Sequence, residues 1–245
     1  MVDVSNKRII ITGGAQGIGR ATAELLLKYG AKIVIIDIVD ELAYSDTAKD
    51  LLYVKANLLA EQELITGFNQ AIELLDDKID VLINSAGIIK RGPAFELTNE
   101  NWHNTLQLNV VSVFALSQLA ANLMKDNGGG KIINFGSILS NFGGFNAAAY
   151  STSKGAITQL TKSLSNEWAQ YGIQVNAVAP GYMQTQMNND LMNDPVRAPQ
   201  VVARIPAQRW GTAEDVAKVV LFLSSELSDY VTGTIIPVDG GVLGR

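Results

Sequence analysis

Residues 8–29 join a short apolar run to a helical pattern through a turn that is rich in glycine (RIIITGGAQGIGRATAELLLKY). Gly13, Gly17 and Gly19 allow the chain to turn tightly and let other groups approach its backbone closely. The helix that follows carries free N–H groups and the positive end of its dipole at its N-terminus, and both suit a pyrophosphate. The segment therefore predicts a strand, a phosphate-binding turn and a helix, the opening unit of an α/β fold.

Strand-like and helix-like segments alternate along the rest of the chain. The strand-like runs are continuously apolar, which is typical of strands buried on both faces. This repetition predicts an α/β fold with a Rossmann-type, doubly wound parallel sheet of about seven strands and helices on both faces. Strands are expected at 8–12, 32–36, 51–56, 80–84, within 128–137, at 174–178 and at 234–238, and helices at 16–29, 61–75, 99–125, 149–171 and 213–224.

The length and composition are consistent with one domain over residues 1–245. Of the 245 residues, 47% are hydrophobic and 18% are charged, so the chain can bury a sizeable core. There is no internal repeat and no linker. The least regular stretch, residues 182–206, is rich in Asn, Asp, Gln and Pro and contains three methionines. A long polar insertion in a compact domain is often a binding loop, so this segment is expected to be a substrate lid.

Charge and residue usage exclude several classes of function. The net charge of −5 disfavours binding to nucleic acid or to an anionic membrane. The absence of cysteine excludes disulfides, thiolate catalysis and thiolate metal sites, and no metal site is expected. The N-terminus lacks a signal-peptide pattern, and no apolar run is expected to approach the ~18 residues of a membrane span. The expected setting is cytoplasmic.

An acidic residue ends the second expected strand. Asp37 closes the run IVIID, at the point where a carboxylate accepts hydrogen bonds from ribose hydroxyls and repels a 2′-phosphate. Together with the glycine turn, Asp37 predicts a dinucleotide site that takes NAD (NADH) in preference to NADP.

Six short motifs follow one another in a fixed order. They are TGGAQGIG (12–19), NSAG (84–87), LNV (108–110), GSILS (136–140), YSTSK (150–154) and PGYMQT (180–185). In this order the chain resembles the short-chain dehydrogenase/reductase family over essentially its whole length. Two positions depart from the family pattern, because Ser85 replaces a second Asn and Asn57 stands where an Asp is usual.

The resemblance implies which residues bind the nicotinamide cofactor. An Asn carbonyl at position 57 can still accept a hydrogen bond from the adenine amino group, so the departure there does not remove the site. The cofactor-binding residues implied are Thr12, Gly13, Gln16, Gly17, Ile18, Gly19, Asp37, Asn57, Leu58, Asn84, Ala86, Gly87, Tyr150, Lys154, Pro180, Gly181, Met183 and Thr185.

Tyr150 and Lys154 lie one helical turn apart, so both side chains share one face of the helix. A free tyrosine has a pKa of about 10, and a nearby ammonium lowers that pKa by favouring the phenolate. Ser137 follows a strand at the edge where ligands bind in doubly wound sheets. The resemblance implies that Tyr150 is the acid/base, that Lys154 lowers its pKa and holds ribose, that Ser137 orients the substrate, and that Asn109 supports a water-linked proton path.

Basic residues are the main sequence clue to the substrate. Lys90 and Arg91 follow the NSAG motif and either bind a carboxylate, together with Ser137 and Tyr150, or form a solvated basic loop. In RIPAQRWG (204–211), Arg204, Arg209 and Trp210 are either substrate contacts or anchors of the 182–206 segment, and anchoring is favoured.

The stretches AGIIKR, RIPAQRWG and SDYVTGTIIPVDGGVLGR are most similar to the 2-deoxy-D-gluconate 3-dehydrogenases, also described as 2-keto-3-deoxygluconate dehydrogenases. This implies an NAD(H)-dependent interconversion of a keto group and a secondary hydroxyl on a deoxy sugar acid. The alternatives are a gluconate 5-dehydrogenase, a 3-oxoacyl-carrier-protein reductase, or a dinucleotide-binding sensor without activity. The resemblance also implies a homotetramer.

Overall fold

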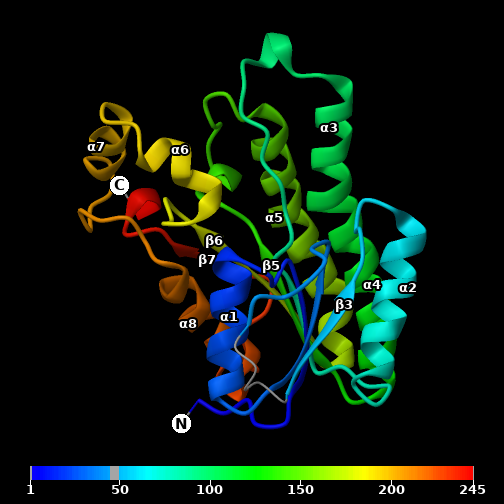
Figure 1. Ribbon diagram of the computed structural model, residues 1–245. Helices are drawn as coiled ribbons and strands as arrows, with labels where there is room; N and C mark the ends of the chain where they lie inside the picture. The colour runs from blue at the N-terminus through cyan, green and yellow to red at the C-terminus, as the bar shows by residue number, and fades with distance from the viewer. Residues whose placement is uncertain (1, 45–49, 245) are drawn as a thin grey trace.

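The computed structural model describes residues 2–44 and 50–244. Seven parallel strands form one sheet in the order β3-β2-β1-β4-β5-β6-β7 (Figure 1). This order confirms the doubly wound sheet expected from the sequence. The strands are β1 (Arg8–Thr12), β2 (Lys32–Asp37), β3 (Leu51–Lys55), β4 (Val81–Asn84), β5 (Gly130–Phe135), β6 (Ile173–Pro180) and β7 (Ile235–Val238).

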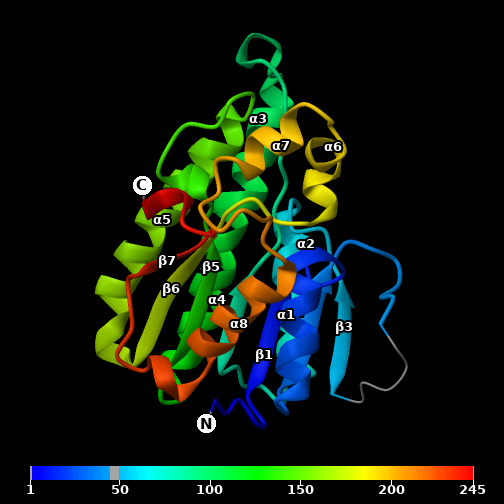
Figure 2. The same ribbon diagram turned by 90° about the vertical axis from the view of Figure 1, so that its left-hand side faces the viewer.

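Helices cover both faces of the sheet. One face packs against α1 and α8, which lie side by side in front of the strands in Figure 2, and the other packs against α2, α4 and α5. These helices are α1 (Gly17–Lys28), α2 (Glu61–Glu73), α3 (Asn99–Leu106), the π-helical turn η2 (Gln107–Val111), α4 (Ser112–Asp126), α5 (Ala148–Trp168) and α8 (Ala213–Ser224).

Most strands are continuously apolar because β1 to β6 each contribute to two cores. Ile10 of β1 belongs to the cluster beneath α2 and α4, whereas Ile9 and Ile11 belong to the cluster beneath α1 and α8. Successive side chains of a strand point to opposite faces, so a strand with both faces covered needs an apolar residue at every position. Burying one such side chain stabilises the fold by roughly 1.5–3 kcal/mol.

The helix formed by α3, η2 and α4 reaches the length of a membrane span. It runs for 28 residues, and an 18-residue window within it has a mean hydropathy of 1.3. The expectation that no apolar stretch approaches this length was therefore wrong. The buried face of α4, with Leu116, Ala120 and Met124, packs into the core against the sheet, and 39% of the apolar window is buried.

The carboxyl ends of the strands meet at one edge, where strand order reverses between β1 and β4. Ligands of doubly wound folds bind at such a switch point. The 182–206 segment lies over this edge (Figures 1 and 2) and contains the turns η5 (Gln186–Asn188), α6 (Asn189–Met192) and α7 (Arg197–Val202). It has a small apolar cluster of its own, formed by Leu191, Val201, Ile205 and Trp210.

Candidate active site

The glycine turn after β1 is shaped by two positions that exclude any side chain. Gly13 has a φ of +68°, and a Cβ there would lie 2.7 Å from Cα of Ala86. A Cβ on Gly19 would lie 2.2 Å from the carbonyl oxygen of Gly13. The turn therefore folds onto itself and against the residue after β4, leaving a shallow cradle at the start of α1. Such a cradle, with free N–H groups, fits a pyrophosphate.

Asp37 stands at the end of β2 beside this turn. Its Oδ2 accepts a hydrogen bond of 2.9 Å from the amide of Ala15, and its Oδ1 accepts one of 2.7 Å from the amide of Ile38. Each carboxylate oxygen keeps a further lone pair, and Asp37 lines the adjoining cavity. The carboxylate thus fixes the glycine turn and is still able to accept bonds from ribose hydroxyls.

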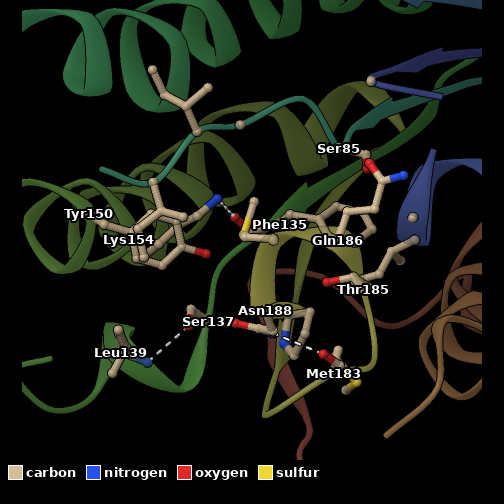
Figure 3. A pocket seen from close by; sticks show the side chains of 18 of the residues that line it. Ser85, Phe135, Ser137, Leu139, Tyr150, Lys154, Met183, Thr185, Gln186 and Asn188 are labelled. Atoms are coloured by element: carbon tan, nitrogen blue, oxygen red, sulfur yellow. Dashed lines mark hydrogen bonds between the residues drawn. The ribbon is translucent and has the colours of Figure 1, made fainter. Parts of the chain in front are cut away.

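One cavity of about 810 Å³ runs along this edge of the sheet, and Figure 3 shows part of its wall. It brings together most residues that the sequence assigned to the cofactor or the substrate. Those that line it are Gly13, Gln16, Gly17, Ile18, Gly19, Asp37, Asn57, Leu58, Ala86, Gly87, Arg91, Ser137, Tyr150, Lys154, Pro180, Gly181, Met183 and Thr185.

Four of the assigned residues do not line the cavity. Thr12 and Asn84 are buried beneath its wall: Thr12 Oγ1 accepts from the amide of Ala86 at 3.1 Å, and Asn84 Nδ2 donates to Asn134 Oδ1 at 2.9 Å. Both therefore support the site from within the sheet. Lys90 is exposed outside the cavity, and Asn109 is buried behind it.

Lys154 is buried against the end of β5. Its Nζ donates a hydrogen bond of 2.6 Å to the carbonyl oxygen of Phe135 and lies 5.5 Å from the centre of the Tyr150 ring (Figure 3). Burial lowers the pKa of Lys154 to about 8, because the charged form loses its hydration. As predicted from their i, i+4 spacing, the ammonium and the phenol share one face of α5.

Opposing influences act on the phenol of Tyr150, and burial outweighs the others, so its pKa is raised instead of lowered as the sequence predicted. Burial raises its pKa, while a hydrogen bond with Ser137 and the positive charge of Arg91 lower it. The influence of Arg91 is a feature that the sequence did not indicate, because the two residues are far apart in the chain. A phenol in this setting can exchange a proton with a substrate oxygen in the cavity.

Ser137 is held by the turn that follows β5. Its Oγ accepts a hydrogen bond of 3.1 Å from the amide of Leu139, and its own amide donates to Ser140 Oγ at 3.2 Å. Ser140 Oγ in turn donates to the backbone carbonyl of Lys154 at 2.8 Å, which ties this turn to α5. The Ser137 hydroxyl is thereby fixed in place near Tyr150.

Asn109 lies in the π-helical turn η2, and turns of this kind are frequent at functional sites. Its Oδ1 accepts from the amide of Ile88 at 2.9 Å, and its Nδ2 donates to the carbonyl of Ile88 and to Ser153 Oγ, each at 3.0 Å. Asn109 therefore joins the loop after β4 to the helix that carries Tyr150.

Arg91 links the loop after β4 to the 182–206 segment. Its Nη2 donates to Asn188 Oδ1 at 3.0 Å, and Asn188 Nδ2 donates to the carbonyl of Met183 at 2.9 Å (Figure 3 shows Asn188 and Met183). Arg91 thus lines the cavity with a guanidinium whose partner is an uncharged amide.

In the stretch RIPAQRWG, Arg204, Arg209 and Trp210 were expected to be either substrate contacts or anchors of the 182–206 segment, and the structure separates them. Arg209 pairs with Asp215 of α8 at 2.7 Å, and Trp210 is buried in the apolar cluster of the 182–206 segment, so both are anchors. Arg204 lines the cavity, as does Arg197, which the sequence analysis missed. The signal for Arg197 was its spacing of seven residues from Arg204, which is two turns of a helix.

Known proteins resemble this chain along almost all of its length. Residues 13–243 match a family model described as "Enoyl-(Acyl carrier protein) reductase". A 2-dehydro-3-deoxy-D-gluconate 5-dehydrogenase from Bacillus subtilis (strain 168) is 41% identical, covering 99% of this chain and 96% of the relative. A 5-keto-D-gluconate 5-reductase from Escherichia coli (strain K12) is 37% identical, with 99% and 98% covered.

Solved structures show the same fold. A gluconate 5-dehydrogenase from Burkholderia cenocepacia J2315, in complex with NADP and tartrate, has a TM-score of 0.94 at 34% identity, covering 100% of this chain and 98% of that one. The TT0495 protein from Thermus thermophilus has a TM-score of 0.91 at 34% identity, with 98% and 99% covered. Family match, identity and fold agree over the whole length: the chain belongs to the short-chain dehydrogenase/reductase family and is an oxidoreductase.

Proposed function

We propose that the protein is an NAD(H)-dependent oxidoreductase that interconverts a keto group and a secondary hydroxyl on a deoxy sugar acid of the 2-keto-3-deoxygluconate type. The observation that carries this proposal is the meeting of Tyr150, Ser137 and Arg91 on the wall of one cavity. The phenol and hydroxyl serve a carbonyl or alcohol, and the guanidiniums that line the cavity suit an anionic substrate. The names of the relatives support a sugar acid.

The residues that line the cavity fit a nicotinamide dinucleotide, because the cradle at Gly13 and Gly19 admits no side chain and opens at the start of α1. When bound, the cofactor supplies the hydride. Thr12 and Asn84 support its site through the wall, and Asn57 and Leu58 line the end near Asp37. Pro180, Gly181, Met183 and Thr185 line the wall after β6.

Tyr150 acts as the acid/base. In reduction its hydroxyl donates a proton to the substrate carbonyl oxygen, and in oxidation its phenolate accepts the proton of the substrate alcohol. Ser137 donates a hydrogen bond to the same oxygen as negative charge develops there. Arg91 favours the phenolate against the burial that raises the pKa of Tyr150, and we propose that the ammonium of Lys154, which lies beside the ring, does so as well. Asn109 holds the loop after β4 against α5 and supports a proton path through water behind Tyr150.

The proposed preference for NAD over NADP rests on Asp37. A 2′-phosphate beside this carboxylate would bring two negative groups together, whereas free ribose hydroxyls would donate hydrogen bonds to it. The Burkholderia cenocepacia neighbour was found with NADP, so the preference must be measured for this chain. We also propose a homotetramer in a cytoplasmic setting, with the exposed Val111 and Phe114 of η2 and α4 in an interface between copies, which light scattering would test.

The test is a panel of ketones assayed at 340 nm with NADH and with NADPH. The panel contains 2,5-diketo-3-deoxygluconate (the ketone formed when 2-keto-3-deoxygluconate is oxidised at C5), 5-keto-D-gluconate, a 3-oxoacyl thioester and a neutral keto sugar. We expect oxidation of NADH with a deoxy keto acid at the highest kcat/KM. Preference for 5-keto-D-gluconate would favour a gluconate 5-dehydrogenase, and preference for the thioester would favour the acyl-carrier reductase. NADH binding without turnover of any ketone would favour the sensor.

A further inference from the structure

The cavity has the opposite charge balance to the chain. The whole chain has 24 acidic and 19 basic residues. Among the described residues that line the cavity, Arg91, Lys154, Arg197 and Arg204 are basic and Asp37 alone is acidic. Lys154 and Arg91 act on Tyr150 in the proposed function. Arg197 and Arg204 are exposed residues that line the cavity and have no part in that chemistry.

Arginines inside and outside the cavity differ in their partners. Of the six in the part of the chain that the structure describes, the three outside the cavity each pair with a carboxylate at 2.7–2.9 Å. The three that line the cavity pair with no carboxylate in the described ranges: Arg91 bonds to an amide, and the guanidiniums of Arg197 and Arg204 form no hydrogen bond or ion pair there. The paired arginines are Arg8 with Asp80, Arg20 with Glu24, and Arg209 with Asp215.

Local structure directs both free guanidiniums to the same side. Arg197, Gln200 and Arg204 occupy positions i, i+3 and i+7 of α7 and the turn that continues it, and all three line the cavity. Val201, on the same side, is buried in the apolar cluster that fixes α7 to the rest of the segment. At the start of α7, Asp194 Oδ1 accepts hydrogen bonds of 2.9 Å from two backbone amides.

Arg91 and the pair Arg197 and Arg204 reach the cavity from different elements: Arg91 from the loop after β4, and the other two from α7 and the turn that continues it. Among the three arginines, Arg91 is the one whose positive charge lowers the pKa of Tyr150. The cavity therefore offers one guanidinium at its reacting end and two beneath α7. A substrate that spans both places needs an anionic group several bonds away from the carbonyl that is reduced.

Resting on the proposed function, we propose that Arg197, Arg204 and Gln200 form a carboxylate-binding subsite on the 182–206 segment. The subsite holds the acid group of the substrate, and the reacting carbonyl lies at the other end of the molecule, beside Tyr150 and Arg91. The guanidiniums bind the carboxylate oxygens, and the Gln200 amide bonds to a neighbouring hydroxyl. The substrate class is a polyhydroxy acid with a keto group remote from its carboxylate, not a 2-oxo acid reduced at C2.

The test compares a keto sugar acid with its methyl ester, which keeps the shape and loses the charge. In Arg197→Gln and Arg204→Gln, we expect the ratio of kcat/KM for acid over ester to fall by roughly 10–100-fold each, the range for a hydrogen bond between charged groups. Arg197→Lys should recover part of the loss. The control is Lys125→Gln, at the exposed end of α4 on the opposite edge of the sheet, which should keep the wild-type ratio.

An unchanged ratio in both arginine variants, with folding verified by circular dichroism and NADH binding, would overturn the subsite. Equal losses for acid and ester would overturn it as well, because they would indicate a packing role. If the wild-type protein reduced no sugar acid, the proposed function would fail, and calorimetric titration of the acid into wild type and variants would still decide the subsite. Reduction of 2-oxo acids at C2 as the best reaction would also contradict the proposal.

Discussion

Lys154 Nζ donates its hydrogen bond to the carbonyl oxygen of Phe135 at 2.6 Å, and this bond joins α5 to the last residue of β5. The side chain of Lys154 is 5% exposed, so a charged amine is held inside the protein beneath the ring of Tyr150. Keeping a cation there opposes folding, because the protein replaces its hydration with few polar partners. We propose that the charge is retained there for its effect on the neighbouring phenol.

The cost of this buried charge predicts a pH-dependent stability. Burial lowers the pKa of Lys154 from 10.5 to about 8, so between these values the unfolded chain binds more protons, and stability rises with pH. The difference corresponds to about 3 kcal/mol. Lys154→Met lacks this pH dependence, and it should be more stable than wild type at pH 7.5 because it buries no charge. The difference in free energy of unfolding between the two proteins should shrink by about 3 kcal/mol between pH 7.5 and pH 10.5. Urea unfolding of both proteins without cofactor measures it, and a constant difference would contradict the assignment.

Tyr150→Phe should abolish turnover and leave NADH binding nearly intact. The variant keeps the ring and loses the proton that reduction delivers to the carbonyl oxygen. General acid/base catalysis contributes about 10²–10⁴-fold, so kcat should fall by at least that range. Fluorescence titration with NADH and steady-state rates at 340 nm provide the two readouts. If the variant kept more than a tenth of the wild-type kcat, Tyr150 would not be the acid/base.

Arg91→Gln should move the pH profile of alcohol oxidation to higher pH. The positive charge of Arg91 lowers the pKa of Tyr150, so removing it raises that pKa and delays formation of the phenolate as pH increases. The ascending limb of kcat/KM against pH should therefore shift towards alkaline values. Lys90→Gln is the matched control, because this neighbouring cation lies outside the cavity. An identical shift in both variants would point to overall charge instead.

Asp37→Asn should relax the choice of cofactor. The substitution removes the negative charge that opposes a 2′-phosphate and keeps one oxygen acceptor, so kcat/KM for NADPH relative to NADH should rise at least tenfold, or about 1.4 kcal/mol. An amide cannot accept from both Ala15 and Ile38 as the carboxylate does, so a stability loss of about 1 kcal/mol should accompany it. A wild-type enzyme that used both cofactors equally would refute the role of Asp37.

The fold could be predicted closely because its determinants are local. The expected bounds of β1 and α8 agree with the structure to the residue, since an apolar run or a helical period begins and ends there. Asn84 shows the limit. Its motif assigned it to the cofactor site, and what the motif could not predict is its partner: the pairing of β4 with β5 places Asn84 opposite Asn134, and their side chains bond to each other. Register between distant strands is not visible in either strand alone.

The place of a residue on the cavity wall could be predicted where its motif also fixes the direction of its side chain, as at Tyr150 and Ser137. It was not predictable for Arg204, whose sequence context matches that of the anchoring Arg209. The two arginines differ in their partners. Arg209 pairs with Asp215 at the start of α8, whereas Arg204 lies in the turn after α7 and lines the cavity. Likewise the influence of Arg91 on Tyr150 depends on how the loop after β4 folds over the cavity.

The π-helical turn at Asn109 also takes up one extra residue within a long helix. It accommodates one more residue than an α-helical turn, and the helix continues from it directly into α4. Deleting a single residue within 107–111 would convert this turn to a regular α-helical one, so the helix after it would keep its phase. Val113, Leu116 and Ala120 would still face the core. The orientation of the 15-residue helix α4 is therefore insulated from the loss of one residue at this turn, whereas the polar contact that Asn109 makes behind the active site is not.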